Sequence, residues 1–350
     1  MKYRQINSII LIVSIVIMVF FLSCTKNDEE VIADYYSVGV ISTQVLSHTT
    51  TKVVVKVRFF VYDKFNDNKL VNFDLSNKIL NPYDSLKRIS LPQKGNFSAA
   101  FILSQGLDET INMEYFYNIL EPTVRKFVHT ATPTNEVLLA KAGDKNRPLE
   151  IIGKGFTRNA DDIDQSLAQL CKNGEYTTSD TLSLLRAIDS TMDYIAAHAS
   201  FSNRHLFIMV SRRKYFFQDY AINTLVSKAL FYNIHCHILE VKYAFTWNNI
   251  NFHNLLLNLN TRTNGIYYET PLTYHLNYDW GELPMDLMQV AGNLPSVFSG
   301  GTDCFEMIVT MTSSYPQFYS GKVFSSEVSI NLSTNDNNEA VSAPFYFYIQ

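Results

Sequence analysis

The chain has 350 residues, of which 47% are hydrophobic and 18% charged, with only 13 glycines and 10 prolines. This composition supports a buried core and excludes a disordered, collagen-like or low-complexity protein. The formal charge of −4 and the isoelectric point near 6.1 argue against nucleic acid as a partner, because nucleic-acid-binding domains usually carry a basic face.

The first 23 residues predict a lipoprotein signal peptide. Lys2 and Arg4 provide a positive start, and an apolar stretch follows from Ile9 to Leu22. A helix of this length spans about 21 Å, which is short of the ~30 Å hydrocarbon core of a bilayer. The segment therefore fits a cleaved export signal better than a permanent membrane span.

Phe21-Leu22-Ser23-Cys24 resembles the lipobox of bacterial lipoproteins in its relaxed, Bacteroidetes-type form. The resemblance implies cleavage before Cys24, a diacylglyceryl group on its thiol and an acylated amine, with palmitate among the expected acids. Residues 24–34 form an acidic tether, which resembles the signal that brings Bacteroidetes lipoproteins to the outer face of the outer membrane. We therefore expect a lipid-anchored outer-membrane protein, with cell-surface exposure as a further expectation. A cleaved secretory peptide with an incidental cysteine is the alternative.

Residues 35–96 are expected to form a β-rich, Ig-like segment. Lys52–Arg58 alternates well enough to predict a strand with one apolar and one polar face. Asn66-Asp67-Asn68 predicts a turn, and residues 70–73 begin another short element.

Residues 97–270 change to strands that alternate with helices, which indicates a doubly wound, mostly parallel α/β sheet. Continuous apolar runs predict strands that are covered on both faces. The strands are expected at 99–103, 137–140, 149–152, 206–210, 234–241 and 265–268, and the helices at 112–129, 161–171, 180–198, 220–231 and 250–259.

Residues 271–350 return to β-character, with one helical interlude near 284–298 and strands near 305–311, 325–332 and 345–349. This segment and residues 35–96 each look too small for a good core of their own. We therefore expect them to pack together as a β-sandwich that flanks residues 97–270, the inserted α/β domain.

The α/β segment resembles a von Willebrand factor A domain. The resemblance covers about 170 residues, and six short stretches carry it in the order and spacing of that family. They are Phe101–Asp108, Thr134–Ala140, Gly155–Thr157, Leu182–Ile188, Arg204–Ser211 and Thr263–Tyr268. In lipoproteins with such domains, the resemblance implies protein–protein binding at the cell surface or within the envelope.

The family's metal-ion-dependent adhesion site holds Mg²⁺ with an Asp-x-Ser-x-Ser loop, a Thr and a second Asp, because this cation prefers oxygen ligands and negative charge. This chain departs from nearly every such position. Only one carboxylate remains, and two arginines would oppose a cation. We therefore expect a metal-free pseudo-site without a cofactor, and Mg²⁺ at Asp108 is the alternative. The corresponding residues are Ser104, Gly106 and Asp108 in the loop, Leu182 or Thr181 for the Thr, and Ser211 for the second Asp, followed by Arg212 and Arg213.

These residues are also the candidate ligand-binding rim, because ligands of open α/β sheets generally sit at the carboxyl ends of the strands. Arg212 and Arg213 would receive an acidic group of a partner directly, without a bridging metal. A solvated rim without any partner is the alternative.

Other chemistry-bearing residues give weaker signals. His235 and His237 share one strand face, but no third ligand lies nearby in sequence, so core histidines are the better interpretation. Ser104 and Ser211 have no histidine placed by a motif to activate them, and the common catalytic motifs are absent from the sequence. Cys171, Cys236 and Cys304 allow at most one disulfide and are expected as buried free thiols.

The sequence thus predicts a non-enzymatic envelope or surface lipoprotein that binds protein partners through a von Willebrand A-like domain without metal. Two alternatives stay open. One is a structural accessory subunit of an envelope or secretion complex, and the other is a glycan-binding surface lipoprotein.

Overall fold

The computed structural model describes most of the compact unit Tyr36–Gln350. The described residues are 36–63, 74–75, 78–104, 113–143, 146–173, 181–211, 222–241, 250–270, 283–333 and 338–350. The predicted signal peptide, the lipidation residue Cys24 and the tether lie outside them, as do the turn at 66–68 and the short element at 70–73. None of the helices in the described ranges is long and apolar enough to cross a membrane.

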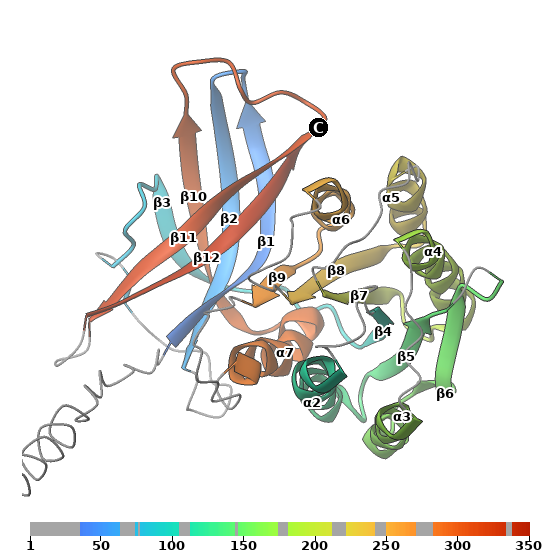
Figure 1. Cartoon of the computed structure of the whole chain (residues 1–350). Helices are drawn as coiled ribbons and strands as arrows, with labels where there is room; N and C mark the ends of the chain where they lie inside the picture. The colour runs from blue at the N-terminus through green and yellow to red at the C-terminus, as the bar shows by residue number, and fades with distance from the viewer. Residues whose placement is uncertain are drawn as a thin grey trace, which may run out of the picture. The chain divides into compact units, whose positions relative to one another are not determined.

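The α/β part is built on a six-stranded sheet with the order β6-β5-β4-β7-β8-β9 (Figure 1). β6 runs antiparallel to β5, and all other neighbours in this sheet are parallel. Counted along the chain from β4, the order is 3-2-1-4-5-6, a doubly wound arrangement. The predicted fold class is confirmed. The strands are β4 (Phe97–Ser104), β5 (Glu136–Ala142), β6 (Leu149–Thr157), β7 (Asn203–Ser211), β8 (Ile234–Val241) and β9 (Tyr267–Thr270).

Helices cover both faces of this sheet, which is why its strands are apolar throughout. In β4, Phe101 and Leu103 belong to the core under α2, α3 and α7, whereas Ala100 and Ile102 belong to the core under α4, α5 and α6. The helices are α2 (Met113–Ala131), α3 (Ala160–Asn173), α4 (Thr181–His198), α5 (Ile222–Phe231), α6 (Ile250–Arg262) and α7 (Leu283–Ser299).

α7 belongs to the α/β core although it follows the whole central sheet in sequence. Its Leu294 and Phe298 are fully or almost fully buried, and the Phe298 ring meets those of Phe97 and Phe127 at centroid distances of 5.6 and 6.3 Å. The helical interlude predicted within the β-rich C-terminal segment therefore covers the central sheet instead of extending the sandwich.

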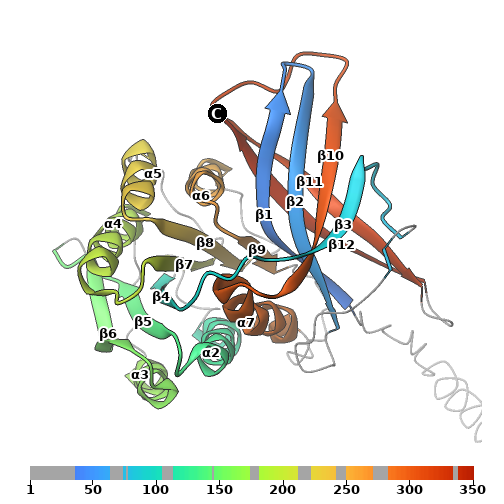
Figure 2. The same cartoon turned by 180° about the vertical axis from the view of Figure 1, so that it is seen from behind.

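The N- and C-terminal segments share one antiparallel sheet with the order β1-β2-β10-β3. β10 comes from the C-terminal segment and pairs with both β2 and β3 of the N-terminal segment. The ribbon β11-β12 packs against this sheet around a common core. Figures 1 and 2 show blue β1 and β2 beside orange and red β10, β11 and β12. The expected sandwich of the two segments is confirmed. Its strands are β1 (Tyr36–His48), β2 (Lys52–Asp63), β3 (Ser85–Ser90), β10 (Asp303–Thr312), β11 (Lys322–Ser333) and β12 (Asn338–Ile349).

β2 is buried on both of its faces over its second half. Its odd-numbered residues from Val53 to Val61 all lie in the sandwich core. Phe60 and Tyr62 point the other way and lie in the α/β core that contains α7. The alternation of Lys52–Arg58 therefore ends where the strand reaches the α/β layer, because both faces must be apolar from Phe59 onward.

Phe60 tests this shared core. It is 2% exposed and lies over Gly39 of β1, where an added Cβ would approach its ring to 2.5 Å. We expect Phe60→Ala to lower the free energy of unfolding by about 3–5 kcal/mol, because it removes a buried ring and leaves a cavity. Urea denaturation measures the change.

Phe231→Ala serves as the matched control, because this phenylalanine is 83% exposed. The control should change the free energy of unfolding by no more than about 0.5 kcal/mol. Equal effects of the two variants would show that the Phe60 ring does not stabilise the α/β core.

Candidate functional site

The carboxyl edge of the central sheet brings two residues of the predicted rim together. Ser104 is the last residue of β4, and Ser211 is the last residue of β7. The two strands are parallel neighbours, with Ser104 opposite Val210. Ser104 and Ser211 therefore reach the same edge within one residue of each other in register.

α4 starts near this edge as well. It ends at His198, shortly before Asn203 begins β7 at the amino edge of the sheet. The helix has 18 residues, or about 27 Å, and the nine-residue strand β7 has a similar length of about 30 Å. Because α4 packs along the sheet, its first residue, Thr181, lies toward the carboxyl edge.

The remaining rim residues, Gly106, Asp108, Arg212 and Arg213, lie outside the described residues. The structure thus gives the backbone position of Ser104, Thr181 and Ser211 and leaves the rest of the rim as a prediction. In the ranges that the structure describes, no group of three or more His, Cys, Asp or Glu side chains is arranged to hold a metal ion.

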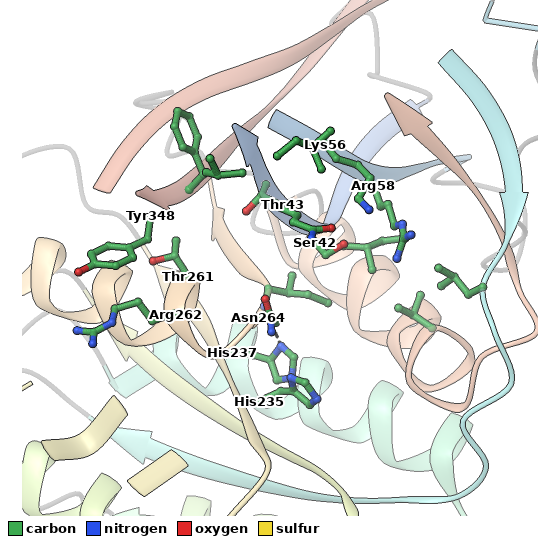
Figure 3. Close-up of a pocket in the computed structure, with 18 of the residues that line it drawn as sticks. Ser42, Thr43, Lys56, Arg58, His235, His237, Thr261, Arg262, Asn264 and Tyr348 are labelled. Carbon is green, nitrogen blue, oxygen red and sulfur yellow. Dashed lines mark hydrogen bonds between the residues drawn. The ribbon is translucent and has the colours of Figure 1, made fainter. Parts of the chain in front are cut away.

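A cavity of about 770 Å³ lies at the opposite, amino edge of the sheet. The sandwich strands β1 and β2 form one wall, and β7, β8, α6 and α7 contribute the other (Figure 3). Ile41, Leu91, Val297 and Phe298 provide apolar surface, while most of the other described lining residues are polar or charged. This size is in the range of small-molecule sites.

The charged side chains that line the cavity are positive, although the whole chain is acidic. Among the described lining residues are Lys56, Arg58, Lys94 and Arg262, and none is Asp or Glu. Lys56 and Arg58 belong to the polar face of β2, four and two residues before Phe60. The polar face that the sequence predicted for this strand therefore forms a wall of the cavity.

Only one of these four cations meets a carboxylate within the described ranges. Arg58 lies 2.8 Å from Glu306 of β10, which also pairs with Lys87 at 3.0 Å. Because these two cations share Glu306, they hold its pKa below the usual value against the opposing effect of burial. Arg262 has neutral contacts, since it donates to Asn223 at 2.6 Å and lies 5.0 Å from the centre of the Tyr348 ring.

A chain of hydrogen bonds fixes the tautomers of two buried histidines beside the cavity. The Ile266 N–H donates to His237 Nδ1 at 2.9 Å, so the proton of the neutral ring sits on Nε2. That nitrogen donates to His205 Nδ1 at 2.9 Å, and His205 Nε2 donates to the Asn203 side-chain oxygen at 3.0 Å. Both imidazoles are therefore satisfied as neutral rings.

His235 differs from this pair, because one of its nitrogens stays available. Its Nδ1 donates to the Thr263 carbonyl at 2.9 Å, which leaves a lone pair on Nε2. Within the described ranges this Nε2 has no hydrogen-bond partner, and the residue lines the cavity (Figure 3). His237 is buried, as the core interpretation predicted, whereas His235 opens on the cavity.

Burial keeps these rings neutral. It lowers the pKa of His205 and His237 well below 6.5, and nearby imidazoles and the charge of Lys94 lower both further. Burial and Lys94 also lower the pKa of His235, against the hydrogen bond to Thr263. The pKa of Lys94 is itself lowered by desolvation and by the charge of Arg58.

Cys236 and Cys304 are buried free thiols. Burial raises the pKa of Cys236 to about 12 and that of Cys304 to about 11. Neither forms a thiolate at neutral pH, and the thiolate is the form that attacks or binds metal.

Sequence reasoning missed this cavity. Lys94 lies in the connection between β3 and β4, and Arg262 ends α6, so neither belongs to a motif. His205 lies one strand away from His235 and is its direct partner in the parallel register. The polar face of Lys52–Arg58 was the one usable signal, but a polar strand face is most simply interpreted as solvated.

Comparison with known proteins gives distant likenesses only. No protein-family model matches the sequence, and no curated protein does. The manganese-loaded TRAP protein of Plasmodium vivax is similar over 75% of this chain and 96% of that chain, with 10% identity and a TM-score of 0.39. The ArnB paralog VWA2 of Sulfolobus acidocaldarius is similar over 90% of this chain and 76% of that chain, with 9% identity and a TM-score of 0.29.

The pilus adhesin SpaC of Lactobacillus rhamnosus GG, in its open conformation, is similar over 89% of this chain and 47% of that chain. Its identity is 8% and its TM-score 0.38. Nothing about activity, metal or partners follows from likenesses at this level.

The buried histidines predict how stability depends on pH. Because the pKa values of His205 and His237 are lowered on folding, the unfolded chain binds more protons than the folded chain below about pH 6.5. The free energy of unfolding should therefore have its full value above that pH and should decrease as the pH falls below it. The slope is at most about 1.4 kcal/mol per pH unit for each histidine. Urea denaturation between pH 7.5 and 5.5 measures it.

Two variants isolate the cause of this slope. His237→Asn keeps an acceptor for the Ile266 N–H and removes one titrating ring, so it should make the slope shallower. Phe231→Ala, at an exposed position on α5, removes no titrating group and should leave the slope unchanged. A slope that is the same in both variants would contradict the assignment.

Proposed function

We propose that the protein is a non-enzymatic lipoprotein of the cell envelope that binds a protein partner at the carboxyl edge of its von Willebrand A-like sheet, without a metal. One observation carries the proposal. The adjacent parallel strands β4 and β7 end at Ser104 and Ser211 on one edge, and α4 begins near it at Thr181. This edge is where open α/β sheets generally bind their ligands.

Metal independence is supported by the residues at the strand ends. Ser104 and Ser211 stand where the resembled family has carboxylates. Mg²⁺ requires several oxygen ligands and favours negative charge, and two arginines directly follow Ser211. Arg212 and Arg213 are instead suited to bind carboxylates of a partner through charge-assisted, bidentate hydrogen bonds.

The lipid anchor is supported by the sequence around Cys24. Two or three acyl chains, at about 0.8 kcal/mol for each buried methylene, would hold the protein at a membrane essentially permanently. Because the chain is acidic, its net charge would oppose attachment to an anionic membrane surface, so the lipid must provide the attachment.

The rim is tested by reversing its charge. We expect Arg212→Glu combined with Arg213→Glu to abolish partner capture in cells that produce the protein, because the two guanidinium groups would no longer meet acidic groups. Cross-linking, affinity purification and mass spectrometry identify the partners, in parallel samples with Mg²⁺ and with EDTA. Capture should be equal in both samples of the unmodified protein.

Lys52→Glu combined with Lys322→Glu is the matched control, because it reverses two exposed charges on the sandwich and gives the same net charge. The control should capture the same partners as the unmodified protein. Partners that persist in the rim variant would refute the site, and partners lost only in EDTA would refute metal independence.

Lipidation is tested separately by Cys24→Ser. We expect this variant to lose incorporation of labelled palmitate and to leave the membrane fraction, because it lacks the thiol that receives the diacylglyceryl group. Cys171→Ser should keep both properties. Label that remains on the Cys24→Ser variant would show that another residue carries the lipid.

A further inference from the structure

The cavity at the amino edge of the sheet is not used by the proposed function. It includes His205 near the start of β7 and His235 near the start of β8, whereas the predicted rim lies where the strands end. From His205 to Ser211 a strand advances about 20 Å. The cavity and the rim are therefore different sites at opposite ends of the same strands.

The cationic groups of the cavity are short of counter-charges. Lys56 and Lys94 have no ion-pair partner among the described residues, and Arg58 shares Glu306 with Lys87. Placing several cations around one cavity costs free energy through mutual repulsion and desolvation. The lowered pKa of Lys94 beside Arg58 is one sign of that cost. An arrangement of this kind favours binding of an anion.

Neutral polar groups add hydrogen-bonding capacity beside the cations. Ser42 and Gln44 lie on β1 directly opposite Arg58 and Lys56 in the antiparallel register, so they line the same wall. The lone pair of His235 Nε2 accepts a hydrogen bond from an O–H or N–H group. It cannot bind an anionic oxygen as long as the ring is neutral. The ligand that fits must therefore carry both an anionic group and a hydroxyl or amine hydrogen.

Size and polarity narrow the class further. A volume of about 770 Å³ accepts a molecule with one or two rings. Apolar residues such as Ile41, Leu230 and Phe298 make up part of the lining, and the cations and hydroxyls on β1 and β2 add many polar contacts. The alkyl chain of a fatty acid would remove these polar groups from water without giving them hydrogen-bond partners, which is costly. A polyhydroxylated anion would pair them.

We propose that this cavity binds a hydroxylated organic anion, a sugar acid or a sugar phosphate. Its anionic oxygens contact Lys56, Lys94 and the free side of Arg58, and one of its hydroxyl groups donates to His235 Nε2. Arg262 lies across the cavity, from where it contacts a second polar end of the ligand (Figure 3).

Isothermal titration calorimetry of the full-length protein tests this site with five probes: glucuronic acid, glucose 6-phosphate, glucose, inorganic phosphate and a glutamate-rich peptide. We expect saturable binding of at least one of the two sugar anions, weaker binding of phosphate, and no binding of glucose. Whichever sugar anion binds more tightly identifies the anionic group as a carboxylate or a phosphate. Affinity should fall as salt is raised, since the attraction is between charges.

Three variants locate the binding. Lys56→Met and Lys94→Met should each raise the dissociation constant of the bound sugar anion about tenfold, whereas Lys52→Met, on the same strand as Lys56 but outside the cavity lining, should not change it. His235→Asn keeps a donor for the Thr263 carbonyl and removes Nε2. It should weaken binding of the sugar anion and leave binding of inorganic phosphate unchanged.

Four outcomes would overturn the proposal. They are no binding of either sugar anion at millimolar concentration, binding of glucose as tight as that of the anions, equal dissociation constants in the Lys56→Met and Lys52→Met variants, and tight binding of a glutamate-rich peptide in place of the sugar anions. The last outcome would reassign the cavity to a protein partner. None of these results depends on whether the rim at the other edge binds its own partner.

Discussion

Burial of β2 on both of its faces is the constraint on which the rest of the structure depends. The odd-numbered residues of this strand form the sandwich core, and Phe60 and Tyr62 complete the α/β core next to α7. Neither layer can separate from the strand without exposing large apolar side chains to water, at a cost of about 1.5–3 kcal/mol for each. The α/β domain is therefore joined to the sandwich by a shared core as well as by the two chain connections.

The same strand also creates the cavity. Toward its start, β2 leaves the α/β layer, and its outward face changes from Phe60 and Tyr62 to Arg58 and Lys56. The space that opens is bounded by His235 and by the end of α6. Hydrogen bonds already fix the imidazoles there, because His235 contacts the Thr263 carbonyl and His237 contacts the Ile266 N–H. These hydrogen bonds hold His235 and His237 in place before a ligand arrives, which reduces the entropy lost on binding.

Sequence patterns predicted the parts of the fold that depend on local periodicity. Apolar runs such as Phe101–Leu103 indicated strands covered on both sides, and the small size of the two β-segments indicated that they share a sandwich. Patterns could not show that Phe60 and Val61 serve different cores, because periodicity describes one strand and not its neighbours. They also could not bring His205 to His235 or Lys94 to Arg58, because these pairs depend on strand register and on a connection without regular structure. The rim residues came from a family resemblance, and their side chains remain a prediction.

The two proposed binding sites lie at opposite edges of the central sheet. At its carboxyl edge, where β7 ends at Ser211, we propose a rim that binds a macromolecule. At its amino edge, the sandwich closes over the strands and leaves a bounded cavity suited to a small anion.

The strands between the two edges are packed on both faces, and close-packed cores deform little. Coupling between distant sites requires an element with two alternative arrangements. Because the connecting strands are held by two cores at once, the two binding free energies are expected to add, so that either ligand binds with the other already present.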